Sequence, residues 1–385
     1  MQLTARQRKI PRKLSPVGGV VLAAIILALV VGGSHLVQWL NPGQKITPRT
    51  VGNLEELPTL IRHDAAIRAI AFHPQPNADL SFVSSSADGL IKLWKLNQDQ
   101  ATEQLALQAG QSIALSPDGN LLASLDFEGT AKLWDLTRNN IPFRSIPNSQ
   151  GAYGLSFSPD RQVLASSYAD GTIKLWDWKN QKLLNTLKSN ETSVYYSIAF
   201  SPDGQILASS DGDQTTKLWN WKTGKVVRTL QGELGGGSIV FSPDGQTLAS
   251  GVSDGTLQTI TLLDWNSGQV IQTIRVPASY SDVAFSPDGE ILASNSDKGI
   301  KLWNVRDGKE VRTIQEGASP FVFSPDGQTL ASSSDNGTIK LWNRSDGRLI
   351  REFQGREKSI SALRFSPDSQ TLIGSSYDGT IALWN

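Results

Sequence analysis

Few side chains in this sequence have the types and spacing that catalysis requires. The chain has no cysteine and three histidines, His35, His63 and His73. It contains no His-Glu-x-x-His, Gly-x-Ser-x-Gly or phosphate-binding-loop string. General acid–base and nucleophilic catalysis both need titratable groups within hydrogen-bond reach of one another. We therefore predict that the chain is not an enzyme, and we expect turn or structural roles for His63 and His73.

Carboxylates are the remaining candidates for chemistry. The motif Ser-Pro-Asp-Gly recurs along the chain, but it supplies one carboxylate per turn, and this spacing builds no calcium cage. We expect these aspartates to form turns instead. The short apolar segments that precede the motif carry Arg68, Arg364 and a single acid, Asp282. Because a glycosidase-type site needs two carboxylates, a hydrolase is the least favoured function, and we expect no metal and no cofactor.

The charge balance argues against nucleic acid as a partner. Lysine plus arginine number 36 and aspartate plus glutamate number 36, so the formal net charge is zero. A nucleic-acid binder needs a basic surface to neutralise phosphates. Hydrophobic residues make up 39% of the chain, which is typical of a globular protein.

Two landmarks recur at intervals of about 40 residues and indicate the elements that hold these side chains. The first is a tryptophan, usually after leucine, at Trp94, Trp134, Trp176, Trp219, Trp265, Trp303, Trp342 and Trp384. The second is an apolar residue that precedes the proline turn, at Phe72, Leu115, Phe157, Phe200, Phe241, Phe285, Phe323 and Phe365. Both landmarks occur eight times, which predicts eight copies of one unit.

Each unit reads as short strands separated by tight turns. In the seventh unit the segments ASPFVF, TLASSS and TIKLWN are separated by SPDGQ and DNG. Proline and Asp-Gly favour reversals of the chain, and alternating residues such as Thr-Ile-Lys-Leu-Trp favour a strand with two faces. A more variable fourth strand follows, as in KVVRTLQG at 225–232. Four strands per unit predict one blade of a β-propeller.

The string SPDGQTLASSSDNGTIKLWN resembles the WD-repeat (tryptophan–aspartate repeat) family in its bacterial style, over residues 56–385. The resemblance implies four-stranded blades around a central channel, with the innermost strand ending at the Phe-Ser-Pro motif. It also implies a buried Asp–His–Ser–Trp hydrogen-bond network in each blade. The aspartate place holds Asp88, Glu128, Asp170, Asp213, Asp254, Asp297, Asp335 and Asp378. Histidine stands in its place only at His63, so the full network is expected in blade one at best.

We expect the eight repeat tryptophans to be structural. Their spacing follows the blade, and each buries about 150–250 Å² in a core. Trp178 and Trp221 lie outside the repeat, two residues after Trp176 and Trp219, and the sequence leaves open whether they cover the blade rim or are half exposed.

The first segment of the repeat region, residues 56–62, resembles an outer strand without a blade before it. The chain ends at Asn385, directly after the third strand of the eighth unit. If residues 56–62 supply the missing outer strand of blade eight, the ring closes and no sheet edge stays open. We therefore assign residues 55–385 to one propeller of eight blades.

The N-terminal residues predict a membrane anchor. Residues 17–40 form an apolar run that ends at Trp39 and Leu40, and about 20 such residues cross a bilayer as a helix. Residues 1–16 carry five lysines and arginines and no acid, which places this basic stub in the cytoplasm and the propeller on the extracytoplasmic side, in the periplasm or an equivalent lumen. Residues 41–54 form a linker. A cleaved signal peptide is the alternative.

The tyrosines suggest where a partner binds. By the resemblance, the starts of the inner strands and the hairpins between second and third strands open on one face, usually called the top. The candidate contact residues on that face are Arg68, Phe127, Tyr153, Tyr168, Tyr195, Tyr196, Tyr280 and Tyr377. Tyrosine is enriched in binding surfaces, although aromatic residues could equally well pack the mouth of the ring. We predict a non-catalytic scaffold, tethered to the membrane through residues 17–40, that binds other proteins. The alternative is a sensor or small-ligand receptor that uses the channel.

Overall fold

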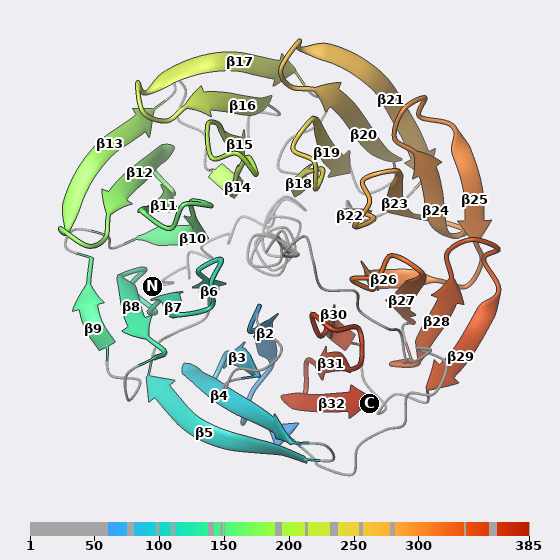
Figure 1. The fold of residues 1–385 in the computed structure, drawn as a ribbon, viewed down its shortest axis with the longest axis horizontal. Helices are drawn as coiled ribbons and strands as arrows, with labels where there is room; N and C mark the ends of the chain where they lie inside the picture. The colour runs from blue at the N-terminus through green and yellow to red at the C-terminus, as the bar shows by residue number, and fades with distance from the viewer. Residues whose placement is uncertain are drawn as a thin grey trace, which may run out of the picture.

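The fold is a ring of eight four-stranded antiparallel sheets (Figure 1). The computed structural model describes residues 61–384 apart from 75–80, 98–99, 109–111, 138–141, 147–148, 150, 189–194, 212–214, 232–237, 254–256, 278–281, 335 and 354–359. The predicted all-β propeller of eight blades is confirmed. No helix within the described ranges is long and apolar enough to cross a membrane; the predicted stub, anchor and linker, residues 1–54, lie outside those ranges.

Blades one to seven run outward from the central axis through four strands in chain order, and blade eight does so for its first three strands. The innermost strands are β2 (Ile67–Phe72), β6 (Ser112–Leu115), β10 (Ala152–Phe157), β14 (Tyr195–Phe200), β18 (Ser238–Phe241), β22 (Val283–Phe285), β26 (Ala318–Phe323) and β30 (Ile360–Phe365). The second strands are β3 (Phe82–Ser86), β7 (Leu121–Leu125), β11 (Val163–Tyr168), β15 (Leu207–Asp211), β19 (Thr247–Ser253), β23 (Ile291–Ser296), β27 (Thr329–Ser333) and β31 (Leu372–Ser376). The third strands are β4 (Leu90–Asn97), β8 (Ala131–Asp135), β12 (Thr172–Asp177), β16 (Thr215–Asn220), β20 (Leu257–Asp264), β24 (Gly299–Asn304), β28 (Ile339–Asn343) and β32 (Thr380–Trp384). The outer strands of blades one to seven are β5 (Gln100–Gln108), β9 (Pro142–Ser145), β13 (Lys182–Lys188), β17 (Lys225–Gln231), β21 (Gln269–Pro277), β25 (Glu310–Ile314) and β29 (Leu349–Phe353).

The ring closes through the first strand, β1 (Ile61–Arg62), which is the outer strand of blade eight. Ile61 pairs with Ile381 and Arg62 pairs with Thr380 on β32. The Ile61 side chain is buried between blades eight and one. Within the predicted closing strand 56–62, these two residues pair with blade eight, and residues 55–60 lie outside the described ranges.

The Ser-Pro-Asp-Gly motifs form the turns between first and second strands. In blade four the Ser201 hydroxyl donates to Asp203 and accepts the backbone N–H of Ile206 at 3.0 Å. Asp203 Oδ1 also accepts the backbone N–H of Gln205, at 3.0 Å. Gly204 takes a φ of 68°, a conformation that favours glycine. The aspartates of these turns are therefore used to fix the chain reversal, as the sequence predicted.

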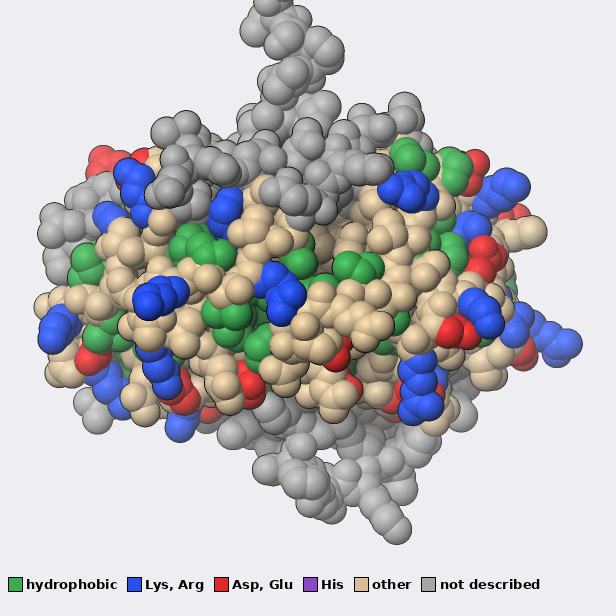
Figure 2. All heavy atoms as spheres, turned by 90° about the horizontal axis from the view of Figure 1, so that it is seen from above, with side chains coloured by type: hydrophobic (Ala, Val, Ile, Leu, Met, Phe, Trp, Pro, Cys, Tyr) green, Lys and Arg blue, Asp and Glu red, His purple; other side chains and the backbone are tan. Residues whose placement is uncertain are grey.

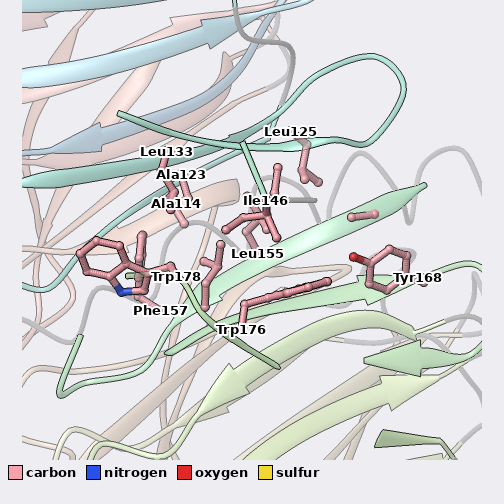
Figure 3. Close-up of a cluster of buried hydrophobic side chains, with 13 residues drawn as sticks. Ala114, Ala123, Leu125, Leu133, Ile146, Leu155, Phe157, Tyr168, Trp176 and Trp178 are labelled. Carbon is pink, nitrogen blue, oxygen red and sulfur yellow. The ribbon is translucent and has the colours of Figure 1, made fainter. Parts of the chain in front are cut away.

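The hydrophobic core lies between the blades as eight clusters, one at each junction of two neighbouring sheets. Figure 3 shows the cluster between blades two and three, where Leu133 and Ile146 face Leu155 and Trp176. Each sheet buries both faces in this way, so every blade depends on two neighbours.

Six of the repeat tryptophans fix their blade with the same hydrogen bond. In each, the indole Nε1 donates to a buried serine hydroxyl of the second strand at 2.8–2.9 Å. The pairs are Trp94–Ser84, Trp134–Ser124, Trp176–Ser166, Trp219–Ser209, Trp303–Ser294 and Trp342–Ser332.

The placement of Trp265 as the eighth repeat tryptophan needs correction. In blade five Leu263 pairs with Leu248, in the register that Trp176 and Trp219 occupy in blades three and four. Trp265 lies two residues further on, after the end of β20, and its Nε1 donates to the Gly245 carbonyl at 2.6 Å. Leu263 therefore takes the core position.

Trp265 instead belongs with the two tryptophans outside the repeat. Trp178 donates to the Arg161 carbonyl and Trp221 donates to the Gly204 carbonyl, each at 2.8 Å. All three carbonyls lie in the turns between first and second strands. Trp178 and Trp221 are buried, which settles the question that the sequence left open. Each of these indoles therefore links the turn after the third strand to the turn between the first and second strands of the same blade.

Candidate functional site

The loops and hairpins that carry the predicted contact residues lie at one end of the ring. In blade one the first residue of β2, Ile67, pairs with the last residue of β3, Ser86. The start of the inner strand therefore lies beside the hairpin 87–89 that joins the second strand to the third. The same pairing recurs in blade eight, where Ile360 pairs with Ser376. We call this end of the ring the hairpin end.

Several inner strands carry a bulge where they begin. The register shifts between Ile67 and Ala69 in blade one, between Ala152 and Gly154 in blade three, and between Tyr195 and Ser197 in blade four. The residues inside these bulges are Arg68, Tyr153 and Tyr196. A bulge re-aims a side chain and is common next to binding sites. Three of the predicted contact residues therefore occupy one equivalent position.

Three predicted aromatic residues are exposed. Phe127 is 68% exposed, Tyr377 is 46% exposed and Tyr153 is 42% exposed. Phe127 and Tyr377 occupy equivalent places in the hairpins of blades two and eight. The side chains of Tyr195 and Tyr196, and all of Tyr280, lie outside the described residues.

Tyr168 is not on this surface, and its prediction as a contact residue was wrong. It is 4% exposed and belongs to the core between blades two and three (Figure 3). Its hydroxyl is 3.1 Å from Ser166 Oγ, and burial raises its pKa. Tyr168 ends strand β11, one position before the place that Phe127 and Tyr377 occupy. Because side chains alternate along a strand, a shift of one residue turns the ring from the surface into the core.

The exposed aromatics belong to one continuous arc from blade eight to blade three. The blade-eight hairpin meets the segment that leads into blade one, where the His63 N–H donates to the Gly379 carbonyl at 2.8 Å. The blade-two hairpin meets the segment that leads into blade three, where the Gly151 N–H donates to the Glu128 carbonyl at 2.8 Å.

Phe127 links the two halves of this arc. Its ring lies over Gly89 in the hairpin of blade one, so close that a Cβ on Gly89 would lie 2.8 Å from Phe127 Cε2. Gly89 also has a φ of 84°, so a side chain there would be strained and would displace the ring. We call the surface formed by Tyr377, Phe127, Tyr153 and the segments between them the aromatic arc.

A buried network supports the middle of the arc. His63 Nδ1 lies 3.0 Å from Asp88 Oδ2, and Nε2 lies 2.8 Å from Ser84 Oγ, which also accepts from Trp94 Nε1 at 2.8 Å. Burial lowers the pKa of His63 below 6.5 despite the attraction of Asp88. The neutral ring donates from Nδ1 to Asp88 and accepts from Ser84 at Nε2. The network that the family resemblance implied for blade one is present.

Asp88 carries the charge of this network. Burial alone would raise its pKa. The hydrogen bond from the Leu90 N–H and the neighbouring His63 together outweigh burial, so the pKa lies below its usual value. Asp88 also accepts the N–H of Asp64 at 3.1 Å. At neutral pH the arc therefore contains a carboxylate next to an uncharged imidazole.

Arg68 lies in the bulge near the start of the innermost strand of blade one. Its side chain is half-buried, and its Nε is buried with no hydrogen-bond partner among the described residues.

The rim of the ring differs from the hairpin end. Eight exposed aliphatic residues lie on the outer strands of blades three to seven: Leu183, Leu184, Val226, Val227, Val270, Val311, Leu349 and Ile350. Figure 2 shows that apolar patches on the side of the ring are interrupted by charged side chains. Single apolar residues of this kind are normal on a protein surface.

The acid on the inner strands, Asp282, lies at the start of β22. It accepts a hydrogen bond from Ser319 Oγ of blade seven at 2.8 Å. Burial raises the pKa of Asp282 to about 6, against the attraction of Arg364. Burial likewise lowers the pKa of Arg364 to about 10. The carboxyl thus has a hydroxyl as its hydrogen-bond donor and a guanidinium that attracts it, which differs from the paired carboxylates of glycoside hydrolysis.

Comparison with known proteins agrees with the repeat structure. The family model of the WD domain, G-beta repeat, matches residues 54–95, 111–135, 142–177, 181–220, 224–258, 268–304, 308–343 and 347–385. The chain belongs to the WD40 repeat family. Members of this family generally act by binding other proteins.

Individual WD40 relatives match over short stretches. Coronin-7 of Rattus norvegicus is 36% identical over 112 residues, which is 28% of this chain and 11% of that protein. Small ribosomal subunit protein RACK1y of Oryza sativa subsp. japonica is 34% identical over 84 residues, 21% of this chain and 25% of that protein. Nuclear distribution protein PAC1 of Arthroderma otae is 32% identical over 89 residues, 21% of this chain and 19% of that protein. The chain therefore spans a quarter or less of the length of these relatives.

A solved structure matches over most of the ring. The computationally designed Ika8 protein superposes with a TM-score of 0.71 and 27% identity, covering 86% of this chain and 99% of that one. The likeness extends over the whole propeller rather than over a few blades.

Proposed function

We propose that this WD40 propeller is a non-catalytic scaffold that binds other proteins through the aromatic arc. The observation that carries the proposal is the exposure of Phe127, Tyr153 and Tyr377 on one continuous surface. Large aromatic side chains exposed on a rigid frame are typical of binding hot spots. The bulge at Tyr153 and the close approach of Phe127 to Gly89 hold two of these rings in fixed places.

The test compares two triple variants in intact membranes. Phe127→Ala, Tyr153→Ala and Tyr377→Ala together remove the aromatic arc, whereas Val227→Ala, Val311→Ala and Leu349→Ala together remove exposed apolar residues from the rim. Proximity labelling from a C-terminal tag identifies the neighbours of each protein. We expect a reproducible set of neighbours that the arc variant loses and the rim variant keeps. A set that both variants keep would refute the proposal.

We also propose that residues 17–40 anchor the scaffold in a membrane, with residues 1–16 in the cytoplasm and the propeller on the extracytoplasmic side. The support is the apolar run and the basic residues before it. Because the chain has no cysteine, a single introduced cysteine reports its own side of the membrane. Gln104→Cys on the exposed rim should react with an impermeant maleimide in cells whose inner membrane is intact. Reaction only after lysis of that membrane would overturn this topology.

A second candidate function rests on Asp282. Its carboxyl accepts a hydrogen bond from Ser319 and is attracted by the Arg364 guanidinium, groups of the kind that a small-ligand receptor would need. Asp282→Asn should leave the neighbour set unchanged if the protein is a scaffold that uses the arc. Loss of the whole set in this variant, with the fold intact, would favour the receptor.

A further inference from the structure

We infer that the aromatic arc binds a cationic segment of its partner, one that presents arginine or lysine side chains. This inference rests on the proposed function and adds the chemistry of the partner. It is carried by the order of groups along the arc, in which carboxylates lie between the aromatic rings.

This order follows from the hairpin sequences and their contacts. Tyr377 is followed by Asp378, and the Gly379 carbonyl of that hairpin accepts the N–H of His63. Asp64 comes next and bonds Asp88 through its backbone. Beyond Gly89 the arc continues to Phe127 and Glu128, and Gly129 then contacts Ala152, next to Tyr153. The order along the arc is therefore Tyr377, Asp378, Asp64, Asp88, Phe127, Glu128 and Tyr153.

The carboxylates of the arc retain negative charge. Asp64 and Glu128 are exposed, and neither forms an ion pair among the described residues. Asp88 is ionised at neutral pH because its pKa is lowered, and the histidine beside it is neutral.

The lysines of the third strands do not cancel this charge. Lys92 pairs with Glu103 of the rim at 3.0 Å, and Lys132 pairs with Asp126 at 3.3 Å. Among the described residues of the arc, the cations Arg62 and Arg68 stand against the carboxylates Asp64, Asp88 and Glu128.

Guanidinium and ammonium groups match this pattern in two ways. They pair with carboxylates, and they are attracted to the faces of aromatic rings. Arginine does both with one planar group. A polypeptide segment with arginine or lysine side chains offers such cations, so a basic segment of a protein fits this surface.

The test uses the purified full chain and two matched, labelled synthetic peptides. One alternates arginine with serine, and the other has glutamate in place of every arginine. Fluorescence anisotropy measures binding of each peptide. We expect the arginine peptide to bind and the glutamate peptide to bind at least about tenfold more weakly. Affinity for the arginine peptide should fall as salt rises from about 50 to about 300 mM, because exposed charges are screened.

Two variants and a control locate the binding. Glu128→Lys and Phe127→Ala should each weaken the arginine peptide by about tenfold or more, while Val227→Ala on the rim should leave it unchanged. Equal binding of both peptides, no binding of the arginine peptide, or binding that survives both arc variants would overturn the inference.

Failure of the inference and failure of the proposed function give different results. If neighbours in membranes are lost with the arc aromatics but neither peptide distinguishes the variants, the arc binds proteins without this charge preference. If the neighbours survive loss of the aromatics, the arc is not the binding surface.

Discussion

Blades one and eight are adjacent, yet they hold their repeat tryptophan by different interactions. In blade one Trp94 belongs to a network that runs through Ser84 and His63 to Asp88. In blade eight the equivalent of Ser84 is Gly374, and Trp384 Nε1 has no hydrogen-bond partner among the described residues although the side chain is buried. A buried unpaired donor costs about 1–3 kcal/mol.

Packing takes the place of the network in blade eight. The ring of Trp384 lies 5.5 Å from that of Phe353, between ring centres. A Cβ on Gly374 would lie 3.0 Å from Trp384 Cζ3 and 2.9 Å from Ile339 Cδ1, so the indole fills the space that a serine would take. The comparison teaches that apolar contact between blades defines this fold, and that the polar network adds stability only where the sequence supplies it.

The largest expected effect is at the strand that joins these two blades. Ile61→Ala empties a buried position between blades eight and one and should lower the free energy of unfolding by about 2–5 kcal/mol. Chemical denaturation of the full chain measures this loss. Leu183→Ala, on the exposed outer strand of blade three, is the matched control and should change stability by less than about 0.5 kcal/mol. Equal losses would mean that β1 does not close the ring.

The comparison itself is tested by Trp94→Phe and Trp384→Phe. Both changes remove the same volume, but only the first removes a hydrogen bond. We expect Trp94→Phe to lower the free energy of unfolding by about 0.5–1.5 kcal/mol more than Trp384→Phe does. Thermal or denaturant unfolding gives the difference, and indistinguishable losses would contradict the role assigned to the network.

Acid should weaken blade one through His63. Its pKa in the folded protein lies below 6.5, so the unfolded chain binds this proton more readily. The stability that the neutral ring contributes is complete above pH 6.5 and is lost as the pH falls through that value. His63→Gln should therefore lose less stability than the parent protein between pH 7.5 and pH 5. Asp282 titrates in the same window with the opposite sign, but both proteins contain it, so its effect cancels in the difference. Parallel pH profiles of the parent protein and His63→Gln would rule out His63 as the source of the acid sensitivity.

The smallest expected effect on stability is at the arc. Phe127 is largely exposed, so Phe127→Ala should change the free energy of unfolding by less than about 0.5 kcal/mol. Partner binding should nevertheless fall, as measured by the neighbour set in membranes. A strongly destabilised variant would show that Phe127 serves the fold, through its contact with Gly89, rather than binding.

The sequence was sufficient for the ring, because its tryptophans and proline turns recur at a fixed spacing, whereas the blade-one network was implied by the family resemblance at His63 and Asp88. The sequence was not sufficient for Trp265. A shift of two residues keeps a side chain on the same face of a strand, so Trp265 looked equivalent to Trp219. The signal that could have corrected this is Leu218-Trp219-Asn220-Trp221, which aligns with Leu262-Leu263-Asp264-Trp265.

The prediction for Tyr168 was wrong for the opposite reason, since a shift of one residue moves a side chain to the other face of the strand. The exposure of Phe127 depends on its neighbour Gly89, about 40 positions earlier in the chain. Contacts between blades of this kind have no signature within a single repeat. The position of a contact residue was therefore predictable, but the direction of its side chain was not.

The pairing of β1 with β32 also sets the order of events during synthesis. Ile61 and Ile381 are partners, yet almost the whole propeller is translated between them. Blade eight can be completed only after β32 has been made, so closure of the ring cannot precede synthesis of that strand, and it brings together the most distant pair of described strands. Until then the nascent chain exposes the edge of β1 and one uncovered face of its newest blade, the surfaces that invite misassembly.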